Sequence, residues 1–129
     1  MSRPLRPPRE TAHPSETALS AACQSRIRKG YGGEVFKVHG GPSQSKGQPD
    51  LLGCIPTAGA LGRMIAVELK QPGNKPTPLQ YKRLRAWEQA GALAGWVTTE
   101  AELVELLGHL EERGWANPQL VPAPILQSV

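Results

Sequence analysis

Two apolar, β-branched segments joined by a Gly- and Pro-bearing connection constrain the fold more than any other part of this sequence. DLLGCI and MIAVELK have the length and composition of strands, and PTAGALGR between them is typical of a hairpin loop. Successive side chains of a strand point to opposite faces, so Glu68 and Lys70 share one face of the second segment. The other face receives the apolar side chains of Ile65, Val67 and Leu69. The sequence therefore predicts two neighbouring strands with Glu68 and Lys70 side by side.

An acidic residue also opens the first of these segments. Asp50 follows Pro49, and Glu68 comes eighteen residues later. Two carboxylates supply hard oxygen ligands for Mg²⁺ or Mn²⁺, which lower the pKa of a bound water and neutralise charge on a scissile phosphate. Lys70 can orient that water or stabilise the transition state. The pattern indicates a metal-dependent phosphodiesterase, although Glu and Lys two apart also occur as a solvated pair on an exposed strand face.

The motif Pro49-Asp50 followed by Glu68-x-Lys70 resembles the PD-(D/E)XK nuclease superfamily. The wider string GQPDLLG, then IAVELK, then a downstream Gln80 is similar to the VRR-NUC family of virus-type replication-repair nucleases, as a stand-alone domain. The resemblance implies an α/β fold with a restriction-endonuclease-like core, in which a mixed central sheet is flanked by helices.

The remaining elements are predicted in an order that agrees with this fold. Ser15 is an N-cap for a helix that ends at Gly30, and Pro78 stands at the first position of another. The chain is predicted to form, in order, a helix (15–30), strands (34–40, 50–55, 64–70), a helix (77–91), a strand (92–99) and a helix (99–114). The order αβββαβα gives a nuclease domain at 15–114, preceded by a disordered basic arm (1–14) and followed by a Pro-rich, extended tail (115–129).

Three further residues join the expected site through the resemblance. Glu16 continues the inward-facing line of the first helix, and the family places a metal-binding Glu there; the helix dipole alone would also favour it. The backbone carbonyl of Leu69 is implied as a further ligand. Gln80 is implied to shape the active site, although Thr77-x-x-Gln80 is also a complete capping box.

Charge is distributed unevenly and points to a polyanionic partner. Residues 1–49 hold eight Lys/Arg against three Asp/Glu, residues 50–99 six against three, and residues 100–129 one against five. Phosphate neutralisation by basic side chains dominates nucleic-acid affinity, whereas ordinary solvated surface is the alternative explanation. A polar strand edge would equally explain His39. The candidate DNA-binding residues are Lys37, His39, Lys46, Lys75, Lys82, Arg83 and Arg85.

Other site classes lack a signal in the sequence. No run of eighteen apolar residues could span a membrane, and the histidines have no zinc-ligand spacing. Cys23 and Cys54 form no C-x-x-C pair and are expected to be reduced, partly buried thiols in a cytosol. We therefore expect a Mg²⁺- or Mn²⁺-dependent DNA endonuclease, acting as a homodimer on branched or junction DNA in replication or repair, in the cytoplasm of a bacterial or phage-infected cell. The alternative is a catalytically inactive nucleic-acid-binding module on the same fold.

Overall fold

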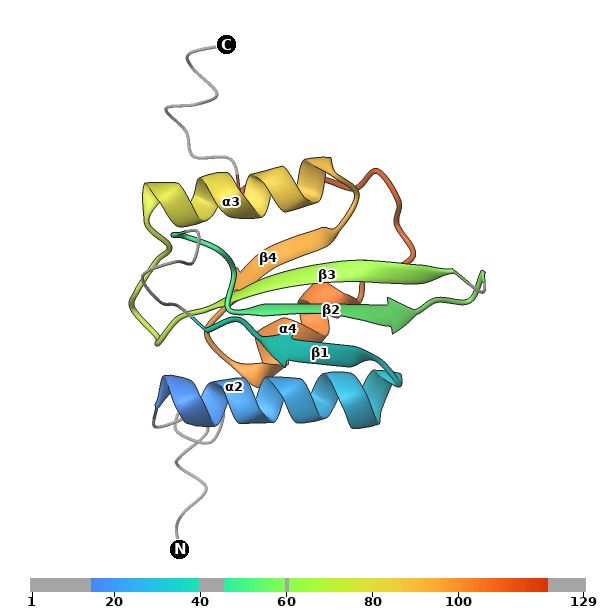
Figure 1. Ribbon diagram of the computed structural model, residues 1–129, viewed down its shortest axis with the longest axis horizontal. Helices are drawn as coiled ribbons and strands as arrows, with labels where there is room; N and C mark the ends of the chain where they lie inside the picture. The colour runs from blue at the N-terminus through green and yellow to red at the C-terminus, as the bar shows by residue number, and fades with distance from the viewer. Residues whose placement is uncertain (1–14, 40–45, 60, 121–129) are drawn as a thin grey trace, which may run out of the picture.

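The elements of the computed structural model, which describes residues 15–39, 46–59 and 61–120, follow the predicted order (Figure 1). They are α2 (Glu16–Ser25) with its π-helical continuation η2 (Arg26–Gly30), β1 (Glu34–Lys37), β2 (Leu51–Pro56), β3 (Gly62–Leu69), α3 (Pro78–Gln89), β4 (Leu93–Val97), α4 (Glu100–Leu107) and the 3-10 turn η3 (Pro118–Leu120). The basic arm predicted at 1–14, and 121–129 of the tail, lie outside the described residues. No helix in the described ranges is both long and apolar enough to cross a membrane.

The four strands form one mixed sheet in the order β1-β2-β3-β4. β1, β2 and β3 are antiparallel neighbours, and β4 runs parallel to β3 because α3 carries the chain back across the sheet. In Figure 1, α2 and α3 lie on opposite sides of this sheet. The prediction of a mixed central sheet flanked by helices is confirmed.

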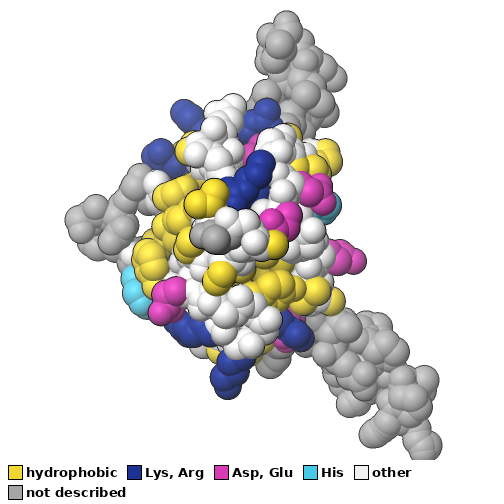
Figure 2. Space-filling model, turned by 90° about the vertical axis from the view of Figure 1, so that its right-hand side faces the viewer, with side chains coloured by type: hydrophobic (Ala, Val, Ile, Leu, Met, Phe, Trp, Pro, Cys, Tyr) yellow, Lys and Arg dark blue, Asp and Glu magenta, His cyan; other side chains and the backbone are white. Residues whose placement is uncertain are grey.

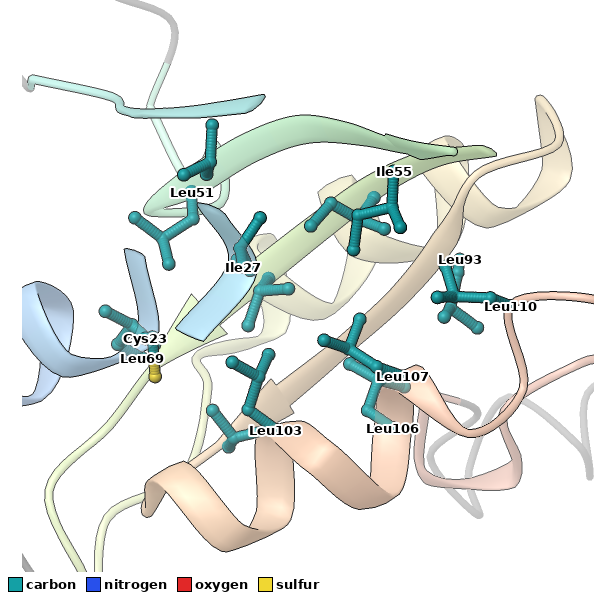
Figure 3. Close-up of a cluster of buried hydrophobic side chains, with 14 of the residues drawn as sticks. Cys23, Ile27, Leu51, Ile55, Leu69, Leu93, Leu103, Leu106, Leu107 and Leu110 are labelled. Atoms are coloured by element: carbon teal, nitrogen blue, oxygen red, sulfur yellow. The ribbon is translucent and has the colours of Figure 1, made fainter. Parts of the chain in front are cut away.

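The larger core lies between the sheet and the two helices α2 and α4 (Figure 3). The predicted line of the first helix is fully buried there, as are the inward-facing positions of β3. Ser15 caps α2 by accepting a hydrogen bond from the Ala18 backbone N–H at 3.0 Å. The sequence predicts inward-facing lines in the first helix (Leu19, Ala22 or Cys23, Ile27) and in the last (Leu103, Leu106, Leu107, Leu110). All of these except Ala22 lie in this core, together with Ile65, Val67 and Leu69 of β3.

A smaller cluster fills the opposite face beneath α3. Leu84 is fully buried against Ala66 and Ala94, and Trp87 is partly buried beside them. The tail contributes as well, because Leu120 packs into this cluster and Asn117 donates a hydrogen bond to the Ala94 carbonyl at 3.3 Å. The predicted extended tail is therefore a short 3-10 turn over this stretch, held against the domain.

The sequence EVFKVHG alternates Phe36 and Val38 with Lys37 and His39, which predicts a half-buried strand with Phe36 on its buried face, and for Phe36 this is wrong. Val35 is the buried residue of that strand, whereas Phe36 is exposed. Positions 35, 36 and 38 are all apolar, so either face of β1 could have packed on the core, and Val35 is the side chain that meets the α2 layer.

Two smaller expectations also differ from the structure. α4 ends at Leu107 rather than near Gly114, because Gly108 caps it and the chain then tightens into turns in which His109 N donates to the Leu106 carbonyl. Cys54 is exposed rather than partly buried, since it points away from the larger core, while Cys23 is buried. Burial raises the pKa of the Cys23 thiol to about 12.

Candidate active site

Asp50 and Glu68 meet at one end of the β2–β3 hairpin. Leu51 pairs with Val67 in the antiparallel register, so the residue before Leu51 and the residue after Val67 are brought together at the next position. The Oδ2 atom of Asp50 accepts a hydrogen bond from the Leu69 backbone N–H at 2.9 Å. This bond fixes one carboxylate oxygen and leaves the other to face the site.

The chain reaches Asp50 through a short segment held against α3. Arg83 Nε donates to the Lys46 carbonyl at 3.2 Å, and Trp87 Nε1 donates to Gln48 Oε1 at 3.0 Å. Gly47 between them has φ 80°, and a Cβ there would lie 2.7 Å from Leu79 Cγ. Both the backbone conformation and the close approach require glycine, so the position of Asp50 depends on a tight contact with the first turn of α3.

Glu68 is a buried carboxyl with an incomplete set of partners. The residue is 2% exposed, and Lys70 Nζ lies 3.6 Å from its Oε2. Its Oε1 is buried and has no hydrogen-bond partner among the described residues. Burial, followed by repulsion from Asp50, raises the pKa of Glu68 to about 8, although Lys70 acts in the opposite direction. Trp96, in register with Glu68 on β4, is partly buried against the cluster that contains Ala66.

This arrangement fits a divalent cation. A buried carboxylate oxygen without a donor, beside a second carboxylate, is a place where positive charge is missing. Asp50, Glu68 and the Leu69 carbonyl are oxygen donors at one strand end, and Mg²⁺ keeps several waters, so few protein ligands suffice. Within the described ranges, no three His, Cys, Asp or Glu side chains form a ready-made cluster around a metal. The chain offers two carboxylates and a carbonyl rather than a closed cage.

The two helix residues expected at the site occupy different positions. Glu16 is exposed in the first turn of α2, so the expectation that it points inward is wrong, but its charge is near enough to contribute to the raised pKa of Glu68. Gln80 forms the capping box: its Oε1 accepts from Thr77 N at 2.9 Å and its own N–H donates to Thr77 Oγ1 at 3.2 Å. The structure therefore places Gln80 in the helix cap.

The candidate DNA-binding residues divide into exposed and engaged groups. Arg83 and Arg85 are only half-buried, and their side chains already bond to the Lys46 carbonyl and to Glu88 Oε1, the latter at 3.4 Å. Lys37 is also half-buried. The exposed members are His39, Lys46, Lys75 and Lys82.

Two residues near the site carried no functional prediction. Gln71 directly follows Lys70, is half-buried, and has a buried Nε2 without a partner in the described part of the chain. Its position next to the ExK triplet was the only sequence signal. Phe36 is exposed on β1, across β2 from β3, and the apolar alternation of its strand indicated burial instead.

The fold and the motif can be compared with known proteins. A solved structure described as a VRR_NUC domain matches this chain with a TM-score of 0.59 and 27% sequence identity, over 73% of this chain and 95% of the other. No family model matches the sequence, and no curated protein matches it closely. The structural match agrees with the family resemblance inferred from Asp50, Glu68 and Lys70, and it confirms that inference.

Proposed function

The chain has the fold of a VRR-NUC nuclease domain, and on that premise we propose that it is an endonuclease that hydrolyses DNA phosphodiester bonds with Mg²⁺ or Mn²⁺ as cofactor. The observation that supports this most directly is the buried Oε1 of Glu68 next to Asp50, which has no hydrogen-bond partner in the part of the chain that the structure describes. A module that only bound nucleic acid would gain nothing from two carboxylates beside phosphate without a cation between them.

Asp50, Glu68 and the Leu69 carbonyl would hold the cation. When bound, it supplies a Lewis acid that activates water and neutralises the developing phosphate charge. Asp50 is oriented for this role because its other oxygen is tied to the Leu69 N–H. Glu68 must lose its proton to serve as a ligand, and its burial ensures that the resulting charge is compensated by the cation rather than by water.

Lys70 contributes a positive charge that is not a metal ligand. Its side chain is 18% exposed, and its Nζ lies 3.6 Å from Glu68 Oε2. An ammonium there can hold the attacking water or stabilise charge on the phosphate oxygens in the transition state.

The same end of the sheet favours an approaching phosphate backbone. β4 is parallel to β3, and α4 begins directly after β4, so the N-terminus of α4 lies at the end of the sheet where β3 stops. The N-terminus of α3 follows the loop that leaves β3 at the same end. The partial positive charge of helix N-termini attracts anions. Exposed Lys75 and Lys82 add full charges on this loop and helix.

Incubation with supercoiled plasmid tests the proposal. We expect nicking or linearisation with Mg²⁺ or Mn²⁺ that EDTA abolishes. Asp50→Asn should lose most cleavage and bind the metal more weakly in calorimetry, whereas Lys70→Ala should lose cleavage but retain metal binding. Glu105→Gln and Lys29→Ala remove exposed charges elsewhere and serve as matched controls.

Two outcomes would contradict this function. Cleavage by folded Asp50→Asn or Lys70→Ala at the parent rate would remove these residues from the reaction. A mobility shift of DNA that is indifferent to metal, without cleavage by the parent chain, would support the inactive binding module instead.

We further propose a homodimer that acts on branched or junction DNA in replication or repair, in the cytoplasm of a bacterial or phage-infected cell. One active site cuts one strand, so opposed cuts at a branch point require two copies related by a two-fold axis. Light scattering combined with cleavage of a four-way junction tests this. A strict monomer that cuts linear duplex as fast as the junction would refute it.

A further inference from the structure

One aromatic side chain stands in the open on the sheet face that carries the carboxylates. Phe36 is 59% exposed, although it lies within strand β1. α3 covers this face over β3 and β4, where Ala66, Ala94 and Leu84 pack together, and does not shield the β1 edge. Figure 2 views the molecule from the end that carries the β2–β3 loop, the opposite end of the hairpin from Asp50 and Glu68, and hydrophobic side chains there gather between basic groups at top and bottom.

The strand register places Phe36 next to the catalytic end. Phe36 pairs with Leu52, which shares a face with Asp50 two residues earlier. The Val38 N–H donates to the Asp50 carbonyl at 2.7 Å, so β1 continues alongside Asp50. Diagonal neighbours of this kind lie about 7–8 Å apart, within reach of an aromatic side chain. The ring of Phe36 is therefore adjacent to the position at which a phosphate would be bound.

We infer, on the basis of the proposed nuclease function, that Phe36 stacks against an unpaired nucleobase adjacent to the scissile phosphate. Every base has a π-face that can stack on an aromatic ring, whereas the bases of a continuous duplex are already stacked on one another. The substrate class is then a strand with unpaired bases at the cut: a single strand, a flap or the arm of a branch. Half-buried Lys37 alternates with Phe36 and lies on the other face of β1, so on this face the ring itself is the group that would meet the base.

A second copy of this chain is the other possible occupant. A specific protein interface buries about 800 Å² from each partner, far more than one ring can provide. The side chains under Phe36 are less accessible: Leu52 and Met64 are half-buried. The single projecting ring beside the carboxylates therefore favours the base.

A binding experiment on the full chain isolates the contact. Single-stranded oligonucleotides carrying one abasic position at successive sites are titrated in EDTA and followed by fluorescence anisotropy. We expect Phe36→Ala to weaken binding of the intact single strand by roughly five- to one-hundredfold, with Phe36→Trp retaining it. For one abasic position, the loss of affinity caused by the abasic site and the loss caused by Phe36→Ala should not add when the two are combined, because both remove the same contact between base and ring.

Two further variants control for surface apolarity. Phe36→Leu keeps an apolar side chain but removes the ring, so it should behave like Phe36→Ala. Val104→Ala removes an exposed apolar group from α4 and should leave binding unchanged. Additive losses at every abasic position, or full affinity in Phe36→Ala, would overturn the inference. So would a change from dimer to monomer in Phe36→Ala without a loss of oligonucleotide affinity, which would assign the ring to a protein interface.

Cleavage separates this inference from the proposed function. If the parent cuts flapped or single-stranded substrates faster than continuous duplex, Phe36→Ala should reduce that preference while Mg²⁺ dependence remains. If the parent cuts but the preference of Phe36→Ala is unchanged, the stacking role fails and the nuclease stands. If the parent binds with the non-additive pattern but cuts nothing, the nuclease fails and the stacking role stands.

Discussion

Replacing Glu68 with Gln should stabilise the folded protein at alkaline pH while removing its activity. The substitution keeps the shape of the side chain and removes a charge that the fold accommodates poorly. Burial raises the pKa of Glu68 from 4.5 to about 8, which at about 1.4 kcal/mol per pH unit corresponds to roughly 4–5 kcal/mol for ionising it in the folded state. That figure is an upper limit, since the substitution also leaves Lys70 without its carboxylate neighbour. We expect a net gain of about 2–3 kcal/mol at pH 9.

The sign of the pH dependence follows from the direction of the shift. Because the folded pKa lies above the unfolded one, the folded state binds more protons between pH 4.5 and about 8, and the stability of the parent falls as pH rises through that window. Glu68→Gln should lack this part of the decline. At pH 5, where the parent carboxyl is also neutral, the two proteins should differ little.

Urea unfolding in EDTA at pH 5, 7 and 9 measures the effect as a change in midpoint at constant slope. Addition of Mg²⁺ at pH 9 should then raise the midpoint of the parent more than that of Glu68→Gln, since the variant keeps Asp50 and the Leu69 carbonyl but lacks the Glu68 carboxylate as a ligand. The exposed Glu105→Gln serves as the control. Parallel pH profiles for parent and Glu68→Gln would show that Glu68 is not held as a raised-pKa carboxyl, and the electrostatic description of the site would be incorrect.

Four other outcomes can be measured. Mg²⁺ affinity by calorimetry should rise from pH 6 to pH 9, because the proton on Glu68 must leave before the cation binds; affinity independent of pH would contradict this. Glu16→Gln should reduce cleavage less than Asp50→Asn, since Glu16 is exposed at the margin of the site, and an equal loss would place it among the essential ligands. Gln80→Ala should lower the free energy of unfolding by about 0.5–2 kcal/mol through loss of the capping box, and Gln80→Glu should restore it. If Gln80 acts only in the helix cap, Gln80→Glu should restore cleavage as well. Arg63→Leu should cost about 2–4 kcal/mol in chemical unfolding without changing kcat, because the buried guanidinium donates to the Gly91 and Leu110 carbonyls; a stable variant would refute this.

The parts of the fold that were predictable are those in which several local signals agree. The hairpin combines strand composition, alternation and a Gly-rich connection, and each predicts the two neighbouring strands that the structure shows as β2 and β3. The helix starts at Ser15 and Thr77 were predictable because capping side chains act within one turn of chain. Local chemistry sufficed for these features, and the match to a VRR_NUC domain agrees with them.

The features that were not predictable depend on which other element covers a face. β1 has apolar residues on both faces, so only the position of α2 decides that Val35 is buried and Phe36 is exposed. The orientation of Glu16 likewise depends on where the first turn of α2 extends beyond the sheet. The engagement of Arg83 with the Lys46 carbonyl requires the approach of two segments far apart in sequence. None of these contacts between elements produces a periodic pattern in the sequence from which it could be predicted.

The contrast between Asp50 and Glu68 explains why a pair of carboxylates can be kept at a site that disfavours charge. Asp50 is the only aspartate in the chain. Its carboxylate is held in position by the hydrogen bond from the Leu69 N–H and by the preceding segment, which is bonded to α3 through Gln48 and Trp87. Glu68 has no equivalent donor for Oε1 among the described residues, and Lys70 at 3.6 Å is too distant for a strong hydrogen bond. A site that satisfied both carboxylates with protein donors would be more stable but would have no place for a cation. The unsatisfied oxygen on Glu68 is therefore a stability cost that we attribute to metal binding, and it is the reason that Glu68→Gln is expected to separate stability from activity.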